Sequence, residues 1–110
     1  MKSGKLAIVR GGGDLATGII YRLWKVGCSV LSLEIPAPLA LRRTVSVASA
    51  VFEGSIIIED MEAVRISSLK DFPFDRSRIY VLVDPEGRSI SELKPDILVD
   101  AIMAKRNLGT

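Results

Sequence analysis

Residues 6–18 read LAIVRGGGDLATG, and they set the architecture of the chain. Residues 6–9 are a short apolar run that ends at an arginine and three glycines, which is typical of a strand buried on both faces. From Asp14 to Val26, hydrophobic residues recur every three to four positions. This spacing predicts a helix with a broad buried face that ends at Gly27.

The glycine-rich turn between this strand and helix matches the pattern G-x-G-x-x-A, with Gly11, Gly13 and Ala16 at the three small positions. In a dinucleotide-binding βα unit, the first glycine makes the tight turn and the second lets the backbone approach a pyrophosphate. The small third residue lets the helix pack close to the strand. Free N–H groups at the helix N-terminus attract anionic oxygens. We therefore predict a phosphate-binding turn that also includes Gly12 and Thr17.

An acidic residue follows at the spacing that this motif requires. Residues 30–33 predict a second strand, and Glu34 ends it 23 residues after Gly11. In dinucleotide-binding folds, an acid about 20 residues beyond the glycines binds the ribose hydroxyls. Because the carboxyl ends of adjacent parallel strands meet at one edge, we expect Glu34 to lie beside the glycine turn. The alternative is that Glu34 is an ordinary acid at a strand end, exposed on the surface and without a ligand.

Asp14 counts against phosphate binding at the turn. A carboxylate at a helix start can cap the helix itself. It also repels a phosphate by about 4 kcal/mol when the charges lie 4 Å apart at an effective dielectric near 20. We expect Asp14 to face solvent or to cap the helix, unless a cation bridges it to the ligand or binding is weak. Thr17 either donates its hydroxyl to a phosphate or is an ordinary first-turn residue.

Further charged residues border the same predicted edge. Arg42 and Arg43 follow the second strand, where paired arginines near Glu34 can hold a 2′-phosphate, a second phosphate or a carboxylate. They also fit a solvated helix start, because adjacent helical residues face different directions. Asp84 and Asp100 end later predicted strands, where such residues line the rim or act as turn and cap residues.

The rest of the chain alternates predicted helices and strands. The expected elements are a helix over 41–52, a hairpin or two short strands over 55–58 and 62–66, a turn or short helix with a loop over 67–78, a strand over 80–83, a helix over 89–93 capped by Ser89, and a strand over 97–99. This alternation predicts one α/β domain over residues 1–110. Its expected form is a Rossmann-like three-layer sandwich, with a mainly parallel sheet and helices on both faces.

The composition limits the classes of function. The chain has 110 residues, of which 48% are hydrophobic, as in a soluble globular domain. A net charge of +2 without a basic stripe argues against a nucleic-acid partner. With no His and one Cys, a His base, a His-ligated metal and a cysteine zinc cluster are excluded. No apolar stretch is long enough for a membrane span, and the unpaired Cys28 predicts a cytoplasmic location.

Five segments together resemble a known family. They are residues 9–18, 34–36, 41–45, 50–54 and 99–110. They resemble the accessory proteins of selenium-dependent molybdenum hydroxylases, a family related in its Rossmann portion to the maturation factors of xanthine dehydrogenase. The resemblance covers nearly the whole chain, and its GGGDLATG and RRTV blocks are the most specific parts. It implies a Rossmann-like domain linked to insertion or maturation of the molybdenum cofactor, with the glycine turn and Arg42-Arg43 as the matching positions.

The resemblance also bears on the extent of the protein. Members of this family continue beyond the segment that matches NLGT, with another glycine-rich block. The 110-residue chain is therefore expected to be a natural short form, one half of a split protein, or the first part of a longer one.

Two functional hypotheses follow. In the first, the domain binds a dinucleotide, either NAD(P) or the dinucleotide form of the molybdenum cofactor, with pyrophosphate on the glycine turn, ribose on Glu34 and another anionic group on Arg42 or Arg43. In the second, it is a non-catalytic interaction or chaperone module that docks a partner such as a molybdenum hydroxylase. Without His, no general base is selected, so no turnover by this chain alone is expected. The exposed faces and edges of so small a sheet predict a homo-oligomer.

Overall fold

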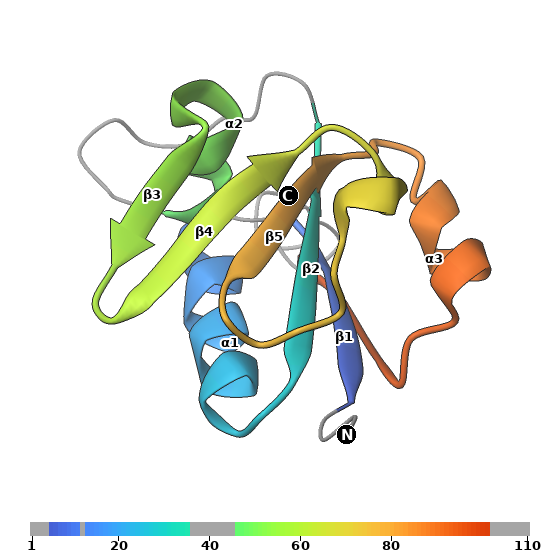
Figure 1. The fold of residues 1–110 in the computed structure, drawn as a ribbon, viewed down its shortest axis with the longest axis horizontal. Helices are drawn as coiled ribbons and strands as arrows, with labels where there is room; N and C mark the ends of the chain where they lie inside the picture. Colours follow the sequence, from blue (N-terminus) through green and yellow to red (C-terminus); the bar gives the residue numbers. More distant parts are fainter. Residues whose placement is uncertain (1–4, 12, 36–45, 102–110) are drawn as a thin grey trace, which may run out of the picture.

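A computed structural model describes residues 5–11, 13–35 and 46–101 (Figure 1). These residues form one six-stranded sheet with short helices packed against it. The strands are β1 (Leu6–Arg10), β2 (Ser29–Glu34), β3 (Ser55–Ile58), β4 (Met61–Ile66), β5 (Ile79–Val83) and β6 (Ile97–Asp100). The helices are α1 (Asp14–Lys25), α2 (Ala50–Glu53) and α3 (Arg88–Leu93), with 3₁₀ turns η1 (Val47–Ser49) and η2 (Leu69–Asp71).

The sheet is mainly parallel, in the order β3-β4-β5-β2-β1-β6. Every neighbouring pair runs parallel except β3 and β4, which form an antiparallel hairpin around Glu59 and Asp60. The predicted α/β class and the predicted hairpin are therefore confirmed. Strands β2, β5, β4 and β3 lie in that spatial order on one side of β1, and the last strand of the chain, β6, lies on the other side of β1. The carboxyl ends of β1 and β6 consequently flank the point where the strand order reverses.

Hydrophobic side chains fill both faces of the sheet. On one face, Val9 and Val30 pack with Ile20 of α1 and Ala50 of α2. On the other face, the core residues Ile8, Leu31, Leu33, Ile66, Phe72, Tyr80 and Leu82 pack with Leu69 of η2 and with Ile90 and Leu93 of α3. Every residue of β2 is buried, as expected of an apolar run in the middle of a parallel sheet.

Helix α1 has the predicted bounds because its two ends are set by glycines. Gly13 is its N-cap. At the other end, Gly27 adopts a φ of 109°, its N–H donates to the Trp24 carbonyl at 3.1 Å, and the Cys28 N–H donates to the Leu23 carbonyl at 3.0 Å. This is the Schellman arrangement, in which a left-handed glycine satisfies the last carbonyls of a helix. None of the helices in the described ranges is both long and apolar enough to span a bilayer.

The predicted helix over 41–52 is much shorter than expected. Residues 41–45 lie outside the described part, and the remainder forms only η1 and the single turn α2. Val47 and Val51 have poor helix propensity because β-branched side chains lose rotamer freedom in a helix. The Ser46 N–H donates to Ser49 Oγ at 3.4 Å, which favours a local turn, and Gly54 ends α2 with a φ of 89°.

The start of α3 differs from the prediction that Ser89 caps it. Ser89 lies inside the helix, and the capping carboxylate is that of Asp84. Its Oδ1 accepts the Arg88 N–H at 3.1 Å, and its Oδ2 accepts the Ser89 N–H at 2.8 Å and the Ser89 hydroxyl at 2.7 Å. Gly87, at a φ of 72°, turns the chain so that Asp84 reaches these donors. The alternative role of Asp84 as a cap residue is thus confirmed.

This cap makes a prediction about acid stability. Burial is the largest influence on the Asp84 carboxyl and raises its pKa, but the hydrogen bonds from Ser89 and Arg88 together bring the pKa below its ordinary value. A lowered folded-state pKa stabilises the fold above the unfolded value of about 3.9, and this stabilisation is lost as the pH falls through the folded value. Asp84→Asn should therefore lower the urea midpoint most near neutral pH and progressively less below about pH 4.

Urea unfolding followed by Trp24 fluorescence measures the effect. Asp71→Asn is the matched control, because Asp71 is an exposed aspartate in η2. Equal losses of stability in Asp84→Asn at neutral and acid pH would contradict the assigned capping role.

Candidate nucleotide-binding site

The carboxyl ends of β1, β2 and β6 bring several of the predicted site residues to one edge of the sheet. In the parallel register, Arg10 pairs with Leu33 of β2 on one side and with Asp100 of β6 on the other. Gly11 continues from Arg10, and Glu34 continues from Leu33, so the glycine turn and the acid lie side by side. Open α/β sheets bind ligands at such an edge where the strand order reverses.

Gly11 lets the backbone turn sharply at this edge, but it supplies no free hydrogen-bond donor. Its φ of 99° is a conformation that side-chain-bearing residues rarely adopt. Its N–H donates to the Leu33 carbonyl at 2.7 Å, and its carbonyl accepts the Ser32 hydroxyl at 3.2 Å. Both backbone groups of Gly11 are therefore paired within the protein, and the donors available to an anion must come from the start of α1.

The start of α1 supplies those donors. Gly13 is the N-cap, and the first helical hydrogen bond runs from the Thr17 N–H to the Gly13 carbonyl at 2.8 Å. The N–H groups of residues 14–16 precede that bond and have no acceptor within the helix. The dipole of this 12-residue helix adds positive potential at the same place. Gly12 and the side chain of Asp14 lie outside what the structure describes, and so do Arg42 and Arg43.

Ala16 and Thr17 face the protein interior. Ala16 is buried in the core beneath α1, where its small side chain allows close packing on the sheet. Thr17 is also buried, and its Oγ1 accepts the Val47 N–H at 3.0 Å. This bond joins α1 to η1, so the Thr17 hydroxyl ties two elements together. The sequence held no signal for this contact, because Thr17 and Val47 are 30 positions apart.

Glu34 is buried, with 6% of its surface exposed, so the alternative of a surface acid is wrong. The reason is that β2 lies between β1 and β5 rather than at an edge of the sheet. By the two-residue period of a strand, Glu34 shares the α1 face with Ser32. Its Oε1 accepts the Ile35 N–H at 3.1 Å. A carboxylate accepts hydrogen bonds, and ribose hydroxyls are donors of the kind that such an acid binds.

Arg10 is a residue of this edge that the sequence analysis missed. Its Nη1 lies 3.6 Å from Asp100 Oδ2, its Nη2 donates to the Pro85 carbonyl at 3.3 Å, and its Nε is buried without a hydrogen-bond partner. Asp100 therefore lies at the carboxyl edge of the sheet, which is one of the two positions predicted for it. The signal that could have found Arg10 is its position, because it ends a buried strand directly before the glycine turn.

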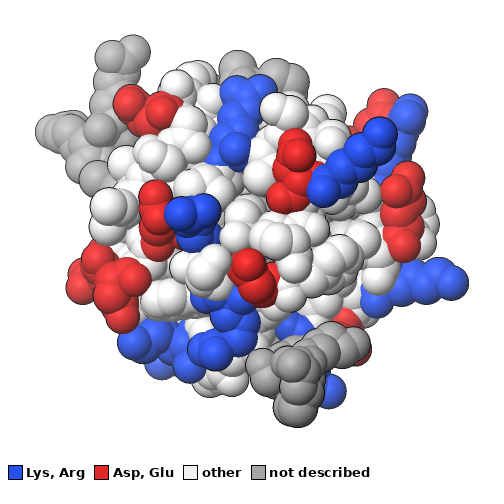
Figure 2. All heavy atoms as spheres, viewed as in Figure 1, with Lys and Arg blue, Asp and Glu red and all other residues white. Residues whose placement is uncertain are grey.

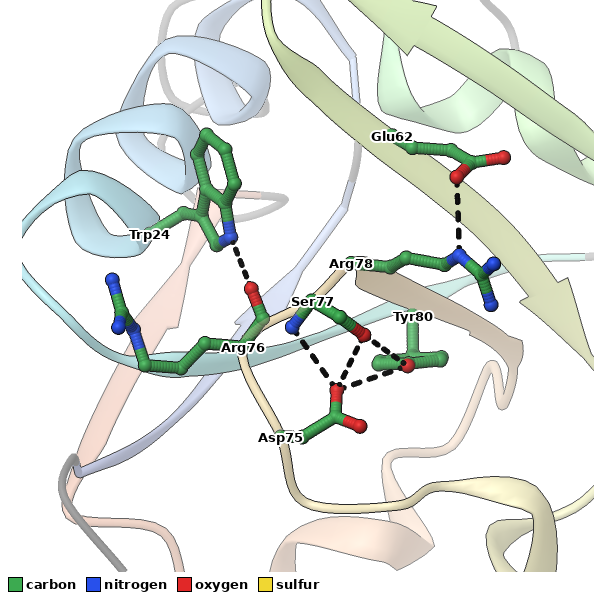
Figure 3. A network of polar contacts seen from close by, with 7 residues as sticks. All are labelled: Trp24, Glu62, Asp75, Arg76, Ser77, Arg78 and Tyr80. Atoms are coloured by element: carbon green, nitrogen blue, oxygen red, sulfur yellow. Dashed lines mark hydrogen bonds and ion pairs between the residues drawn. The ribbon is translucent and has the colours of Figure 1, made fainter.

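A second polar network lies at the other end of the parallel strands, where β5 begins (Figure 3). Asp75 Oδ1 accepts the Ser77 N–H at 3.1 Å, the Ser77 hydroxyl at 2.9 Å and the Tyr80 hydroxyl at 3.1 Å. Burial, the largest influence, raises the pKa of the Asp75 carboxyl, but the Ser77 and Tyr80 hydrogen bonds bring the pKa below its ordinary value. Beside it, the Trp24 indole N–H donates to the Arg76 carbonyl at 2.8 Å (Figure 3). These bonds hold the loop before β5 in place.

Two other observations bear on the chemistry of the described residues. They contain no group of three or more His, Cys, Asp or Glu side chains able to hold a metal ion. Cys28 is buried, and burial raises the pKa of its thiol, which makes it a packing residue rather than a nucleophile. On the face shown in Figure 2, acidic and basic side chains are interspersed.

Comparison with curated proteins finds one similar over nearly the whole chain. The match is to "Uncharacterized protein YqeB" of Escherichia coli (strain K12), with 43% identity over 108 residues. It covers 96% of this chain and 20% of that protein, so the chain spans about a fifth of the length of its relative. No protein-family model matches the chain, and no solved structure matches it.

Proposed function

We propose that this chain is the Rossmann-like, dinucleotide-binding domain of a cytoplasmic accessory protein for molybdenum hydroxylases. The ligand is NAD(P) or the dinucleotide form of the molybdenum cofactor. The observation that carries the proposal is the meeting of the α1 start, the glycine turn and the buried Glu34 at the edge where the strand order reverses. The sequence resemblance over nearly the whole chain supplies the biological context.

Each part of the ligand has a partner in this proposal. The pyrophosphate accepts hydrogen bonds from the N–H groups of residues 14–16, which the left-handed turn at Gly11 lets it approach. Glu34 accepts the ribose hydroxyls. Arg42 or Arg43 holds a further anionic group. The domain binds and orients its ligand and does not turn it over.

The three-layer form of the fold belongs to the same proposal. Its support is the packing of α1 and α2 on one face and of η2 and α3 on the other. The second layer is thin, because α3 has only six residues.

Calorimetric titration tests the proposal. We expect saturable heat with NAD, NADP or the dinucleotide form of the molybdenum cofactor at concentrations up to about a millimolar. AMP is the matched weaker ligand, because it lacks the pyrophosphate that the helix start would hold. The absence of heat with every dinucleotide would remove the proposal.

An exposed edge strand favours a second candidate function, a protein-interaction module. Strand β3 lies at one end of the sheet order and pairs within the described chain only with β4. Ile57 on this strand is 68% exposed, and Phe52 of the preceding α2 is 61% exposed. An apolar edge strand presents unpaired backbone groups to another strand. The partner is a second copy of the chain, which also accounts for the expected homo-oligomer, or a molybdenum hydroxylase.

Ile57→Lys should disrupt association at this edge, because a lysine on an edge strand blocks strand pairing. By light scattering, we expect the wild-type chain to exceed its monomer mass of 11.9 kDa and the variant to fall to it. Ile57→Val, which keeps an apolar β-branched side chain, is the control. A wild-type mass of 11.9 kDa at high concentration would refute self-association. Capture of a molybdenum hydroxylase that survives Gly13→Asp but not Ile57→Lys would favour the interaction module, and loss with Gly13→Asp would count against it.

A further inference from the structure

We propose that Arg10 binds a phosphate group of the ligand at the junction of β1 and β6, and that Asp100 competes with this phosphate for the guanidinium. The inference rests on the proposed function in one respect, that the phosphate belongs to a dinucleotide. It adds to that function a second anion-binding position, distinct from the helix start.

The position of Arg10 favours contact with a ligand at the carboxyl edge. Arg10 is the last residue of β1, and the glycine turn follows it directly. Along β1, Ile8 belongs to the core of the face that carries α3, and by the two-residue period of a strand Arg10 points to the same side. The helix start of α1 lies against the opposite face. A ligand that crosses the carboxyl edge therefore meets the α1 amides first and Arg10 next.

The guanidinium of Arg10 is weakly paired within the protein. Its hydrogen bond to the Pro85 carbonyl is 3.3 Å long, and its distance of 3.6 Å to Asp100 exceeds that of a charge-assisted hydrogen bond. Its buried Nε has no partner. By contrast, Arg78 Nε lies 3.0 Å from Glu62, and Arg65 Nη1 donates to the Val51 carbonyl at 2.7 Å. A five-donor group with so little pairing at a ligand-binding edge is suited to receive an anion.

The surroundings of Arg10 also favour the binding of an anion. The side chain retains 27% exposure, so it is only partly covered by the protein. Of the nearby acids in the 84–87 turn, Asp84 caps α3 and Glu86 pairs with Arg88 at 3.0 Å. Asp100, the register partner of Arg10, is the carboxylate that an incoming phosphate would have to displace. The planar guanidinium fork fits the oxygens of a phosphate.

A purely structural ion pair would give the opposite pattern of mutational effects for Asp100. If the pair only tied β1 to β6, Arg10→Gln and Asp100→Asn would both lower the melting temperature and weaken binding. If Arg10 binds phosphate, Arg10→Gln weakens binding while Asp100→Asn strengthens it, because the competing carboxylate is gone. The sign of the Asp100→Asn effect therefore separates the two roles.

Calorimetric titration with inorganic pyrophosphate and with NADP, alongside thermal melts, measures these effects in the wild type and the variants. We expect Arg10→Gln to weaken binding of both probes by about tenfold and Asp100→Asn to strengthen it by about threefold. Arg10→Lys should fall between Arg10→Gln and the wild type, because lysine keeps the charge without the fork. Unchanged affinity in Arg10→Gln, or weaker binding in Asp100→Asn, would overturn the inference.

The same titrations on Gly13→Asp distinguish failure of this inference from failure of the proposed function. If Gly13→Asp abolishes NADP binding and Arg10→Gln leaves it unchanged, the dinucleotide site stands and the role of Arg10 is overturned. If the wild type binds pyrophosphate but no dinucleotide, and Arg10→Gln weakens the pyrophosphate binding, the Arg10 site stands and the proposed function fails. No binding of either probe by the wild type overturns both.

Discussion

Gly13→Asp is expected to weaken dinucleotide binding by about a hundredfold or more. At the N-cap of α1, an aspartate side chain accepts the first-turn N–H groups that the pyrophosphate would otherwise use. Its charge also repels a phosphate 4 Å away by about 4 kcal/mol at an effective dielectric near 20, an effect that salt reduces. Calorimetry with NADP in low-salt buffer measures the loss.

Gly13→Asn is the matched control for this variant. Asparagine has nearly the shape of aspartate and caps helices equally well, but it carries no charge. Gly13 has a φ of −76° and a ψ of −164°, an extended conformation that either residue adopts at an N-cap, so both variants should fold and melt no lower than the wild type. We expect the Asn variant to lose about tenfold less affinity than the Asp variant. Equal affinities in the two variants would show that no anion binds at the start of α1.

Leu31→Ala is expected to have the largest effect on stability, about 3 kcal/mol. Leu31 is fully buried in β2, where its register partners are Ile8 of β1 and Tyr80 of β5. Truncation leaves a cavity that the strands on both sides prevent from closing. For a domain of this size, the loss corresponds to a fall of roughly 10–20 °C in the melting temperature, which calorimetry or urea unfolding measures.

Leu98→Ala makes the same chemical change at the sheet edge and serves as its control. Leu98 lies in β6 and is 50% exposed, so its truncation should change stability by less than about 1 kcal/mol. Similar losses in the two variants would mean that the core does not centre on β2.

Local patterns were sufficient to predict most elements of this fold. The apolar runs of β1, β2 and β5 and the three-to-four-residue spacing of α1 are properties of neighbouring residues, and so is the stop at Gly27. The failures came where a side chain within a few residues competes for the same backbone groups, as in the turn from Ser46 to Ser49. The cap of α3 is Asp84, because the turn at Gly87 brings that carboxylate back to the helix start ahead of Ser89.

The candidate site likewise has some features that local sequence predicts and others that it does not. Residue type and spacing along the chain were enough to predict that a glycine turn precedes α1 and that an acid ends β2. Three features could be seen only in the folded chain: the Gly11 N–H is paired with Leu33, Glu34 is buried, and Arg10 lies beside Asp100. These facts depend on which strands become neighbours. That order is set by pairings as distant as Leu6 with Asp96, which no local periodicity encodes.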